Sequence, residues 1–502
     1  MQRDISRRRL LSSSALLLSG GLAATGSASG ATAQTGDGAP PLRWTKQYDS
    51  NAVDTALNVV GNGDGTFTAV GATGANTQER QPWLFAFDTD GTGQWQQTYD
   101  VGGQVAMRDL VRTDDGGYLL AGSLAGADTT SARALLIRTD GSGEGQWQQT
   151  YESPGGSATV WSVTTATDGG YVFGGFDAGS GDTTLLGWIV KTDDEGKKVW
   201  ETELTEFQIN YPLEVRQAND GGYLLLGGAR QAPTDGEQQP PFEGWMLKLA
   251  ADGSRQWSRR HVPADVDHKF NLLYDATSTD EGYVLAGITA PSLRGSSPRG
   301  WGMQTDPTGE LRRQSVFRPE GDGLAAFTAA RQYGDGYVFV GQARPGPETT
   351  SQSTWLVGVD GTLSRTWTAT HRVGPSSPTN GAVTTGDGGI AVVGTVQNNQ
   401  DSSTDAFSAK FGGDPAPTPT PAEETATATG TPTSTPTDTP TPTATATPTP
   451  TPTPTPAVTA TATDTPEPTE TTSGGGPGFG VGTALAALGA GALYRRMTDG
   501  DE

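Results

Sequence analysis

The chain contains no cysteine and only three histidines among its 502 residues. The missing cysteine excludes a disulfide framework, a thiolate zinc site, an iron–sulfur cluster and a cysteine nucleophile. The histidines stand singly, without the H-E-x-x-H spacing of a catalytic zinc site. The sequence therefore gives no sign of thiol or zinc chemistry.

Positive charge is also scarce. Lys+Arg total 33 against Asp+Glu 56, which leaves a net charge of -23, and only seven of the cations are lysines. A nucleic acid or an anionic membrane requires a basic surface, so no nucleic-acid partner is expected. The acid-rich, lysine-poor composition resembles that of proteins from salt-loving archaea.

Familiar catalytic motifs are missing as well. The chain has no G-x-S-x-G elbow, no Walker loop and no D-x-[DN]-x-[DN]-G calcium loop. Two pairs of carboxylates, Asp265/Asp267 and Glu237/Glu243, are of the kind that flank a glycosidic bond in glycoside hydrolases. Acid-rich loops are expected in any chain this negative, so we assign no catalytic residue, no metal ligand and no cofactor.

The N-terminus has the pattern of a secretory signal peptide over residues 1–33. A basic start with the pair Arg7 and Arg8 precedes a short apolar core, and Ala31 and Ala33 form an A-x-A cleavage site. The paired arginines resemble the twin-arginine type, which exports folded proteins. The alternative, an N-terminal membrane anchor, is disfavoured because the apolar core is short for a span.

A Thr/Pro-rich segment occupies residues 412–476. Between Pro415 and Thr472, 25 of 58 residues are Thr and 15 are Pro. Such a segment cannot bury a core, so we expect a disordered, extended stalk that suits O-glycosylation. No Asn-x-Ser/Thr sequon occurs in the chain, so N-glycosylation is not expected.

The C-terminal residues 477–502 combine a Pro-Gly-Phe triplet, an apolar Gly/Ala-rich run and a basic pair. In this order after a Thr-rich stalk, they resemble the PGF-CTERM sorting signal of archaeal surface proteins. The residues that carry the resemblance are Pro477, Gly478, Phe479, Arg495 and Arg496. It implies cleavage by a sorting enzyme and a lipid anchor, whereas a short apolar helix that crosses the membrane is the alternative. Both place the protein on the outer cell surface.

The middle of the chain repeats one unit seven times. A Gly/Asp-rich turn precedes an aromatic or aliphatic residue, and a glycine follows four positions later. The first set is Phe67, Tyr118, Tyr171, Tyr223, Tyr283, Tyr337 and Ile390; the second is Gly71, Gly122, Gly175, Gly227, Gly287, Gly341 and Gly394. The steps between units are 51 to 60 residues, which is typical of propeller blades.

Each unit contains four short β-prone segments separated by turn residues. In the second unit they include Tyr118–Gly122, Ala134–Arg138 and Trp147–Tyr151. The last unit ends after its third strand, and Leu42–Tyr48 resembles the missing fourth. The sequence therefore predicts an all-β, seven-bladed β-propeller of four-stranded antiparallel blades over residues 42–411, closed by its N-terminal strand, after a linker at 34–41.

Several turns before the fourth strand follow the spacing Asp-x-x-Gly-x-x-x-Trp, as in Asp88, Gly91 and Trp95. This weakly resembles the docking motif of quinoprotein (PQQ-type) propellers, which implies a quinone cofactor and a calcium ion in the central funnel. No residue set matches that site. The turn glycine and the tryptophan are most simply explained as packing between blades.

The longer loops should share one face of the propeller, and function on rigid scaffolds tends to lie in such loops. The longest lie in and after the fourth unit. The predicted ligand patch on this face comprises Phe242, Glu243, Arg259, Arg260, His261, Asp267, His268, Arg294 and Arg299. Solvated loops without a ligand are the alternative.

Three functions remain open from the sequence. The leading hypothesis is an extracellular, surface-anchored and non-catalytic propeller that binds a glycan or a surface protein. One alternative is an enzyme, either a quinoprotein-like oxidoreductase or a polysaccharide-active hydrolase; another is a structural envelope component. A propeller fold alone does not decide among them.

Overall fold

The computed structural model describes residues 32–413, apart from 51–52, 77–78, 126–130, 178–184, 234–239, 265, 293–296, 320–322, 347–350 and 398–402. The predicted stalk from residue 414, the sorting segment and the signal peptide up to residue 31 lie outside the described residues. In the described part no helix is long and apolar enough to cross a membrane.

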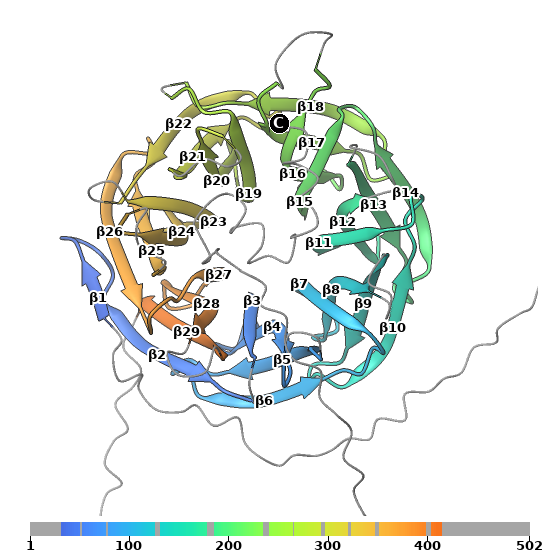
Figure 1. The fold of residues 1–502 in the computed structure, drawn as a ribbon, viewed down its shortest axis with the longest axis horizontal. Coiled ribbons are helices and arrows are strands. Elements are labelled where there is room, and N and C mark those ends of the chain that lie inside the picture. The colour runs from blue at the N-terminus through green and yellow to red at the C-terminus, as the bar shows by residue number, and fades with distance from the viewer. Residues whose placement is uncertain are drawn as a thin grey trace, which may run out of the picture. The chain divides into compact units, whose positions relative to one another are not determined.

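Seven antiparallel sheets stand in a ring around a central axis (Figure 1). Each contains four strands that follow one another in sequence from the axis outwards, except where the N-terminal strands join. The predicted seven-bladed β-propeller of four-stranded blades is confirmed.

The strands occupy four positions in each blade. The inner strands are β3 (Thr55–Gly61), β7 (Gln104–Arg112), β11 (Ala158–Thr165), β15 (Ile209–Gln217), β19 (Phe270–Thr279), β23 (Leu324–Tyr333) and β27 (Thr379–Thr384). The second strands are β4 (Phe67–Thr73), β8 (Tyr118–Ala125), β12 (Tyr171–Asp177), β16 (Tyr223–Arg230), β20 (Gly282–Ala290), β24 (Gly336–Arg344) and β28 (Gly389–Gln397). The third strands are β5 (Gln81–Phe87), β9 (Ala132–Thr139), β13 (Leu186–Thr192), β17 (Glu243–Leu249), β21 (Arg299–Thr305), β25 (Ser353–Val359) and β29 (Thr404–Gly412). The outer strands are β6 (Gly93–Thr98), β10 (Gly145–Tyr151), β14 (Lys198–Leu204), β18 (Arg255–His261), β22 (Leu311–Phe317), β26 (Arg365–Arg372) and β2 (Leu42–Tyr48).

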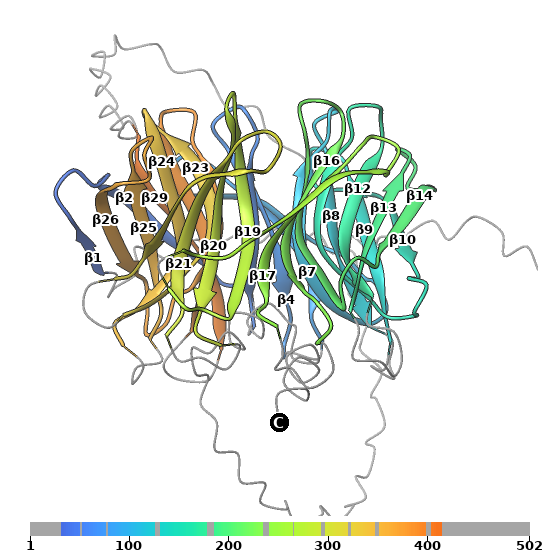
Figure 2. The ribbon, with the colours of Figure 1, turned by 90° about the horizontal axis from the view of Figure 1, so that it is seen from above.

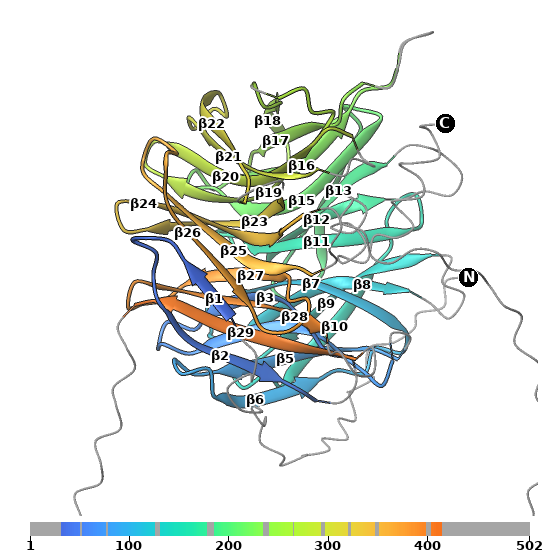
Figure 3. The same ribbon diagram turned by 60° about the vertical axis from the view of Figure 1, so that its left-hand side comes forward.

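The N-terminal strand closes the ring, as the sequence predicts. Strand β2 pairs with β29 as the outer strand of the seventh blade (Figure 3). The hydroxyl of Tyr48, which is fully buried, lies 2.7 Å from Ser408 Oγ in β29 and donates to the Gly91 carbonyl of the first blade at 2.9 Å. One side chain thus joins the two ends of the ring.

A further strand, β1 (Thr32–Thr35), adds to the outer edge of the sixth blade by pairing with β26. It contains Ala33, the last residue of the predicted signal peptide, and Gln34, the first residue of the predicted linker. The signal-peptide boundary drawn from the sequence therefore falls within a strand, with two residues on each side.

Outer-strand tryptophans pack one blade against the next at five of the seven joints. In five blades the turn before the outer strand contains a glycine with φ between 75° and 82°. A Cβ on any of these glycines would lie 2.6 to 3.1 Å from the outer tryptophan of the preceding blade. The pairs are Gly91–Trp44, Gly143–Trp95, Gly196–Trp147, Gly253–Trp200 and Gly309–Trp257. The repeated Gly and Trp are therefore inter-blade packing, as predicted.

The joint between the fifth and sixth blades lacks this tryptophan. Arg313 stands at the equivalent register of β22, opposite Gln304, and donates to the Gly361 carbonyl at 2.9 Å. The turn glycine is replaced by Leu363, which is buried with a φ of 63°. A side chain fits at this left-handed position because no indole occupies the space.

The two faces of the ring differ in their connections. Short turns join first to second and third to fourth strands at one face. The loops between second and third strands and the crossovers between blades lie at the other (Figure 2). The longer connections thus share one face, called the loop face below.

Candidate functional site in the axial channel

Every inner strand contains a β-bulge at the same point. In β7 the register steps from Met107, opposite Gly122, to Asp109, opposite Ala121, so Arg108 has no partner in β8. The same shift occurs in the other six inner strands. A bulge adds one residue to one strand and redirects its side chain.

The repeat glycine makes these bulges possible. A Cβ on Gly122 would lie 2.5 Å from the carbonyl oxygen of Ala106 in the inner strand. At the six equivalent glycines the corresponding distance is 1.7 to 2.2 Å. No residue with a side chain fits so close to a backbone oxygen, which explains the glycine found in all seven units.

The bulged residues form a ring around the axis. All seven line a central cavity of about 110 Å³. They are Leu57, Arg108, Trp161, Leu213, Tyr274, Thr328 and Asn380. The repeat is thus uniform in its backbone and variable at this channel-lining position of each blade.

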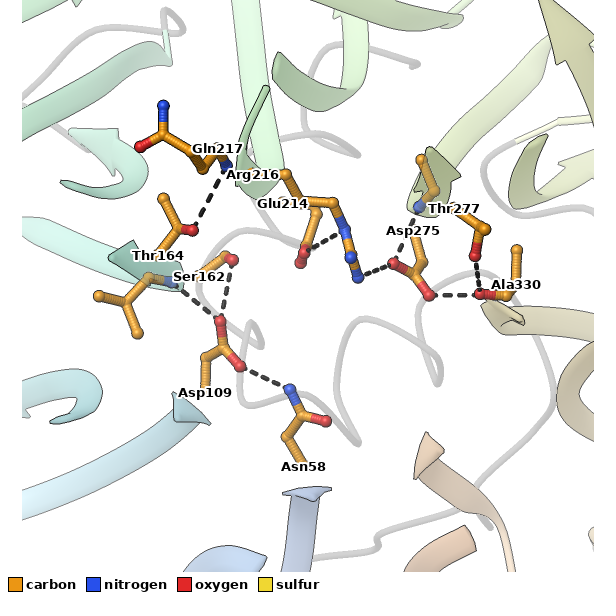
Figure 4. A network of polar contacts seen from close by, with 12 residues as sticks. Asn58, Asp109, Ser162, Thr164, Glu214, Arg216, Gln217, Asp275, Thr277 and Ala330 are labelled. Carbon is orange, nitrogen blue, oxygen red and sulfur yellow. Dashed lines mark hydrogen bonds and ion pairs between the residues drawn. The ribbon is translucent and has the colours of Figure 1, made fainter. Parts of the chain in front are cut away.

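The next residue of several inner strands is a carboxylate that binds the neighbouring blade (Figure 4). Asp109 accepts hydrogen bonds from Asn58 Nδ2 at 2.5 Å, from Ser162 Oγ at 2.9 Å and from the backbone N–H of Val163 at 2.9 Å. Burial nevertheless raises the pKa of Asp109 above its ordinary value. This carboxylate joins the first three blades.

Asp275 follows the bulged residue of β19 in the same way, and it joins the fourth, fifth and sixth blades. Its carboxylate pairs with Arg216 of β15 and with Arg331 of β23, and it accepts the backbone N–H of Ala330 at 3.0 Å. Burial alone would raise the pKa of Asp275, but the two guanidiniums outweigh it and hold the pKa below its ordinary value.

Glu214 completes the charged group. Its Oε1 lies 3.0 Å from Arg216 Nε, and its side chain is 19% exposed along the channel. Burial raises the pKa of Glu214 to about 8, and the carboxylates of Asp109 and Asp275 add to the shift. The positive charge of Arg216 opposes this shift without cancelling it.

Three further bonds close this inter-blade belt. The backbone N–H of Gln217 donates to Thr164 Oγ1 at 3.3 Å, and Arg331 Nε donates to the Ala382 carbonyl at 2.9 Å. Asn380 Nδ2 donates to the Ala56 carbonyl at 2.8 Å. All seven joints between blades are therefore bridged beside the axis, and the carboxylates of the channel are occupied by structural donors.

The predicted ligand patch does not form one surface. Phe242 is 3% exposed and stacks on Phe270 with ring centroids 5.3 Å apart, so it packs inside the ring and faces no solvent. His261 is 9% exposed, with Nε2 3.1 Å from the Gly309 carbonyl of the next blade. Both side chains fill inter-blade space, and neither is more than 9% exposed.

The remaining patch residues fall into two groups. Glu243, Arg259 and Arg260 lie on the third and outer strands of the fourth blade, where Glu243 pairs with Arg260 and Arg259 pairs with Glu310 at 2.7 Å. Asp267, His268 and Arg299 lie together at the loop face. Arg294 lies outside the described residues.

The loop-face group contains one pair of neighbouring cations. Burial and the nearby charge of Arg318 both lower the pKa of Arg299. Neither arginine has an ion-pair partner among the residues the structure describes. Asp267 is exposed and lies 3.6 Å from Lys269 Nζ, and His268 Nδ1 lies 2.8 Å from Thr289 Oγ1.

The channel residues were missed by sequence reasoning, although a signal was present. The residue after each bulge stands eight or nine positions before the repeat anchor, as Asp109 does before Tyr118 and Asp275 before Tyr283. Most inner-strand positions are apolar. An acidic residue eight or nine positions before the anchor therefore indicates a position that faces other polar groups. In the described part of the chain, no three His, Asp or Glu side chains gather as a metal site would require.

Comparison with known proteins finds distant likenesses among solved structures. No protein-family model matches the chain, and no curated protein matches it. Among solved structures it is similar to polysaccharide lyase Uly1, with a TM-score of 0.45 and 11% identity over 72% of this chain and 90% of that one. It is also similar to the phage phi92 endosialidase, with a TM-score of 0.41 and 9% identity over 72% of this chain and 68% of that one. The third is the β-propeller domain of the Trilobed protease from Pyrococcus furiosus, with a TM-score of 0.41 and 9% identity over 71% of this chain and 93% of that one. Likenesses this distant say nothing about what the chain binds.

Proposed function

We propose that this chain is a cell-surface-anchored binding propeller whose loop face holds an acidic glycan or an acidic surface protein. The observation that carries the proposal is the pair Arg299 and Arg318. Two neighbouring guanidiniums that pair with no acid among the described residues, in a chain with a net charge of -23, form a local site for negative charge. Val262, which is exposed in the crossover between β18 and β19, provides a further apolar contact for a partner.

The ends of the chain support an extracellular location for this binding. Residues 1–33 suit the export machinery, and residues 477–502 suit a sorting enzyme and a membrane anchor. The Thr/Pro stalk would hold the propeller away from the envelope.

The contacts of the channel carboxylates argue against catalysis in the channel and therefore favour a binding role for the chain. A glycosidase needs one carboxyl to donate a proton and a second to act as nucleophile or base. Here Asp109 and Asp275 accept several inter-blade hydrogen bonds each, and Glu214 is paired with Arg216. These contacts describe a structural belt.

The test is a binding measurement with the secreted protein and immobilised polygalacturonate, with neutral dextran as the reference. We expect saturable binding to the acidic polymer that weakens as salt rises. The double variant Arg299→Gln/Arg318→Gln should raise the Kd at least tenfold. The matched control is Arg112→Gln/Arg365→Gln, which removes the same charge from exposed arginines at the ends of β7 and β26 on the opposite face.

Two results would contradict the proposal. Equal loss of binding in both double variants would show a response to net charge alone. Shortening of the polysaccharide during the assay would make the chain a lyase or hydrolase.

A further inference from the structure

Arg108 is a buried cation without a counter-ion among the described residues. Its side chain is 8% exposed at the bulge of β7, and its guanidinium carbon lies 4.5 Å from the centroid of the Trp161 ring. No hydrogen bond or ion pair joins it to another described residue, and Nε is buried without an acceptor. Burial lowers the pKa of Arg108 to about 10, so the group stays charged at neutral pH.

Other donors around Arg108 are also unsatisfied. Trp161 Nε1 and the hydroxyls of Tyr211 and Tyr274 are buried and have no hydrogen-bond partner in the described part of the chain. Trp161 and Tyr211 meet edge to face with centroids 5.8 Å apart, and the charge of Arg108 acts on the Tyr211 hydroxyl. Buried polar groups in native proteins are almost always hydrogen-bonded. Four neighbouring donors without a partner therefore indicate that an acceptor binds here.

The cavity beside these donors can hold that acceptor. Arg108, Trp161 and Tyr274 all line the axial cavity of about 110 Å³, several times the space that one buried water needs. Its lining carries the guanidiniums of Arg108, Arg216 and Arg331 and the acids Asp109, Glu214 and Asp275. Arg216 pairs with Glu214 and Asp275, and Arg331 pairs with Asp275, so among the described residues Arg108 is the lining guanidinium that lacks an anion.

We infer that the axial channel binds a small oxyanion, a carboxylate or a phosphate, with Arg108 as its counter-ion and Trp161 and Tyr274 as further hydrogen-bonding groups. A planar guanidinium donates two parallel hydrogen bonds to such a group. The indole face holds the guanidinium in place while its N–H edge points to an acceptor. This site lies on the axis, and it stands whether or not the loop face binds an acidic polymer.

The direct test is calorimetric titration of the full-length secreted protein in chloride buffer with sodium acetate and, separately, with inorganic phosphate. We expect saturable 1:1 binding of at least one of the two. The arm that saturates tells whether a carboxylate or a phosphate is preferred. Arg108→Met should raise the Kd at least tenfold, whereas Arg112→Gln, an exposed arginine at the end of the same strand, should leave it unchanged.

A second measurement separates binding from a structural role. In chloride buffer, Arg108→Met should melt at or above the wild-type temperature, because it removes a buried, unpaired charge. Added oxyanion should raise the melting temperature of the wild type and leave that of the variant unchanged. Two results would overturn the proposal: no saturable binding of either oxyanion over chloride, or a lower melting temperature for Arg108→Met under both conditions.

Discussion

Gly122 and Ala106 meet so closely that a Cβ on the glycine would lie 2.5 Å from the alanine carbonyl oxygen. This contact between β8 and β7 marks the position where the inner strand bulges and turns Arg108 towards the axis. The same arrangement recurs in all seven blades. The glycine that repeats in every unit of the sequence therefore permits the bulge that repeats in every inner strand.

Gly122→Ala should destabilise the propeller. The added methyl group cannot fit beside the Ala106 carbonyl without moving the inner strand, and overpacking of this kind costs about 1–3 kcal/mol. Denaturant unfolding measures the loss. Gly361→Ala is the control, because its Cβ would meet nothing within 4 Å. Equal stability of the two variants would mean that the inner strands do not need the glycine.

Asp275→Asn should cost about 3–5 kcal/mol of unfolding free energy. The substitution keeps the size of the side chain but leaves Arg216 and Arg331 without their shared negative charge beside the channel. Asp267→Asn at the exposed loop face should change stability by less than about 0.5 kcal/mol. A small effect at Asp275 would show that the belt does not hold the blades together.

Glu214 should make the protein less stable as the pH rises towards 8. Its ordinary pKa is 4.5 and its folded pKa is about 8, so between these values the folded state holds a proton that the unfolded state has lost. Stability then falls with pH, by less than about 1.4 kcal/mol per unit for one proton. Glu214→Gln should remove this part of the slope. An unchanged slope in the variant would assign it to another group.

Asp275 acts in the opposite direction at low pH. Because its folded pKa lies below its ordinary value, its contribution is complete above the unfolded pKa and is lost as the pH falls through the folded pKa. The acid limb of the stability curve should therefore be shallower in Asp275→Asn than in the wild type. Thermal melts across the acid range compare the two proteins, with Asp267→Asn as the reference, and parallel limbs would contradict this role.

Removal of β2 should open the ring. A chain that begins at residue 49 leaves the edge of β29 unpaired in the seventh blade, and exposed edges recruit other chains. We expect oligomers by size-exclusion chromatography with light scattering. A chain that begins at residue 36 lacks β1 but keeps β2, and it should have the same oligomeric state as the full chain. Identical behaviour of both truncations would argue against closure by β2.

The sequence predicted the fold well because blade architecture depends on features that repeat. The turn glycines, the outer tryptophans and the spacing of Tyr118 and its equivalents all recur at fixed intervals. The site depends on features that do not repeat, since each bulged residue differs from blade to blade. Arg108 and Trp161 stand 53 positions apart and meet only because neighbouring inner strands place both at the axis. Phe242 and His261, which loop length placed in the ligand patch, are buried because strand ends beside long loops still pack between blades.

The most direct test of this account uses the absence of cysteine, which allows single thiols to report on each position. Thr328 is the bulged residue of β23 and lines the channel, whereas Ala330 is fully buried two positions later. The measurement is the labelling rate of Thr328→Cys and Ala330→Cys with a small methanethiosulfonate reagent in the native protein. We predict that the first reacts and the second is protected. In a strand without the bulge, positions 328 and 330 would face the same side, so equal rates would contradict the account.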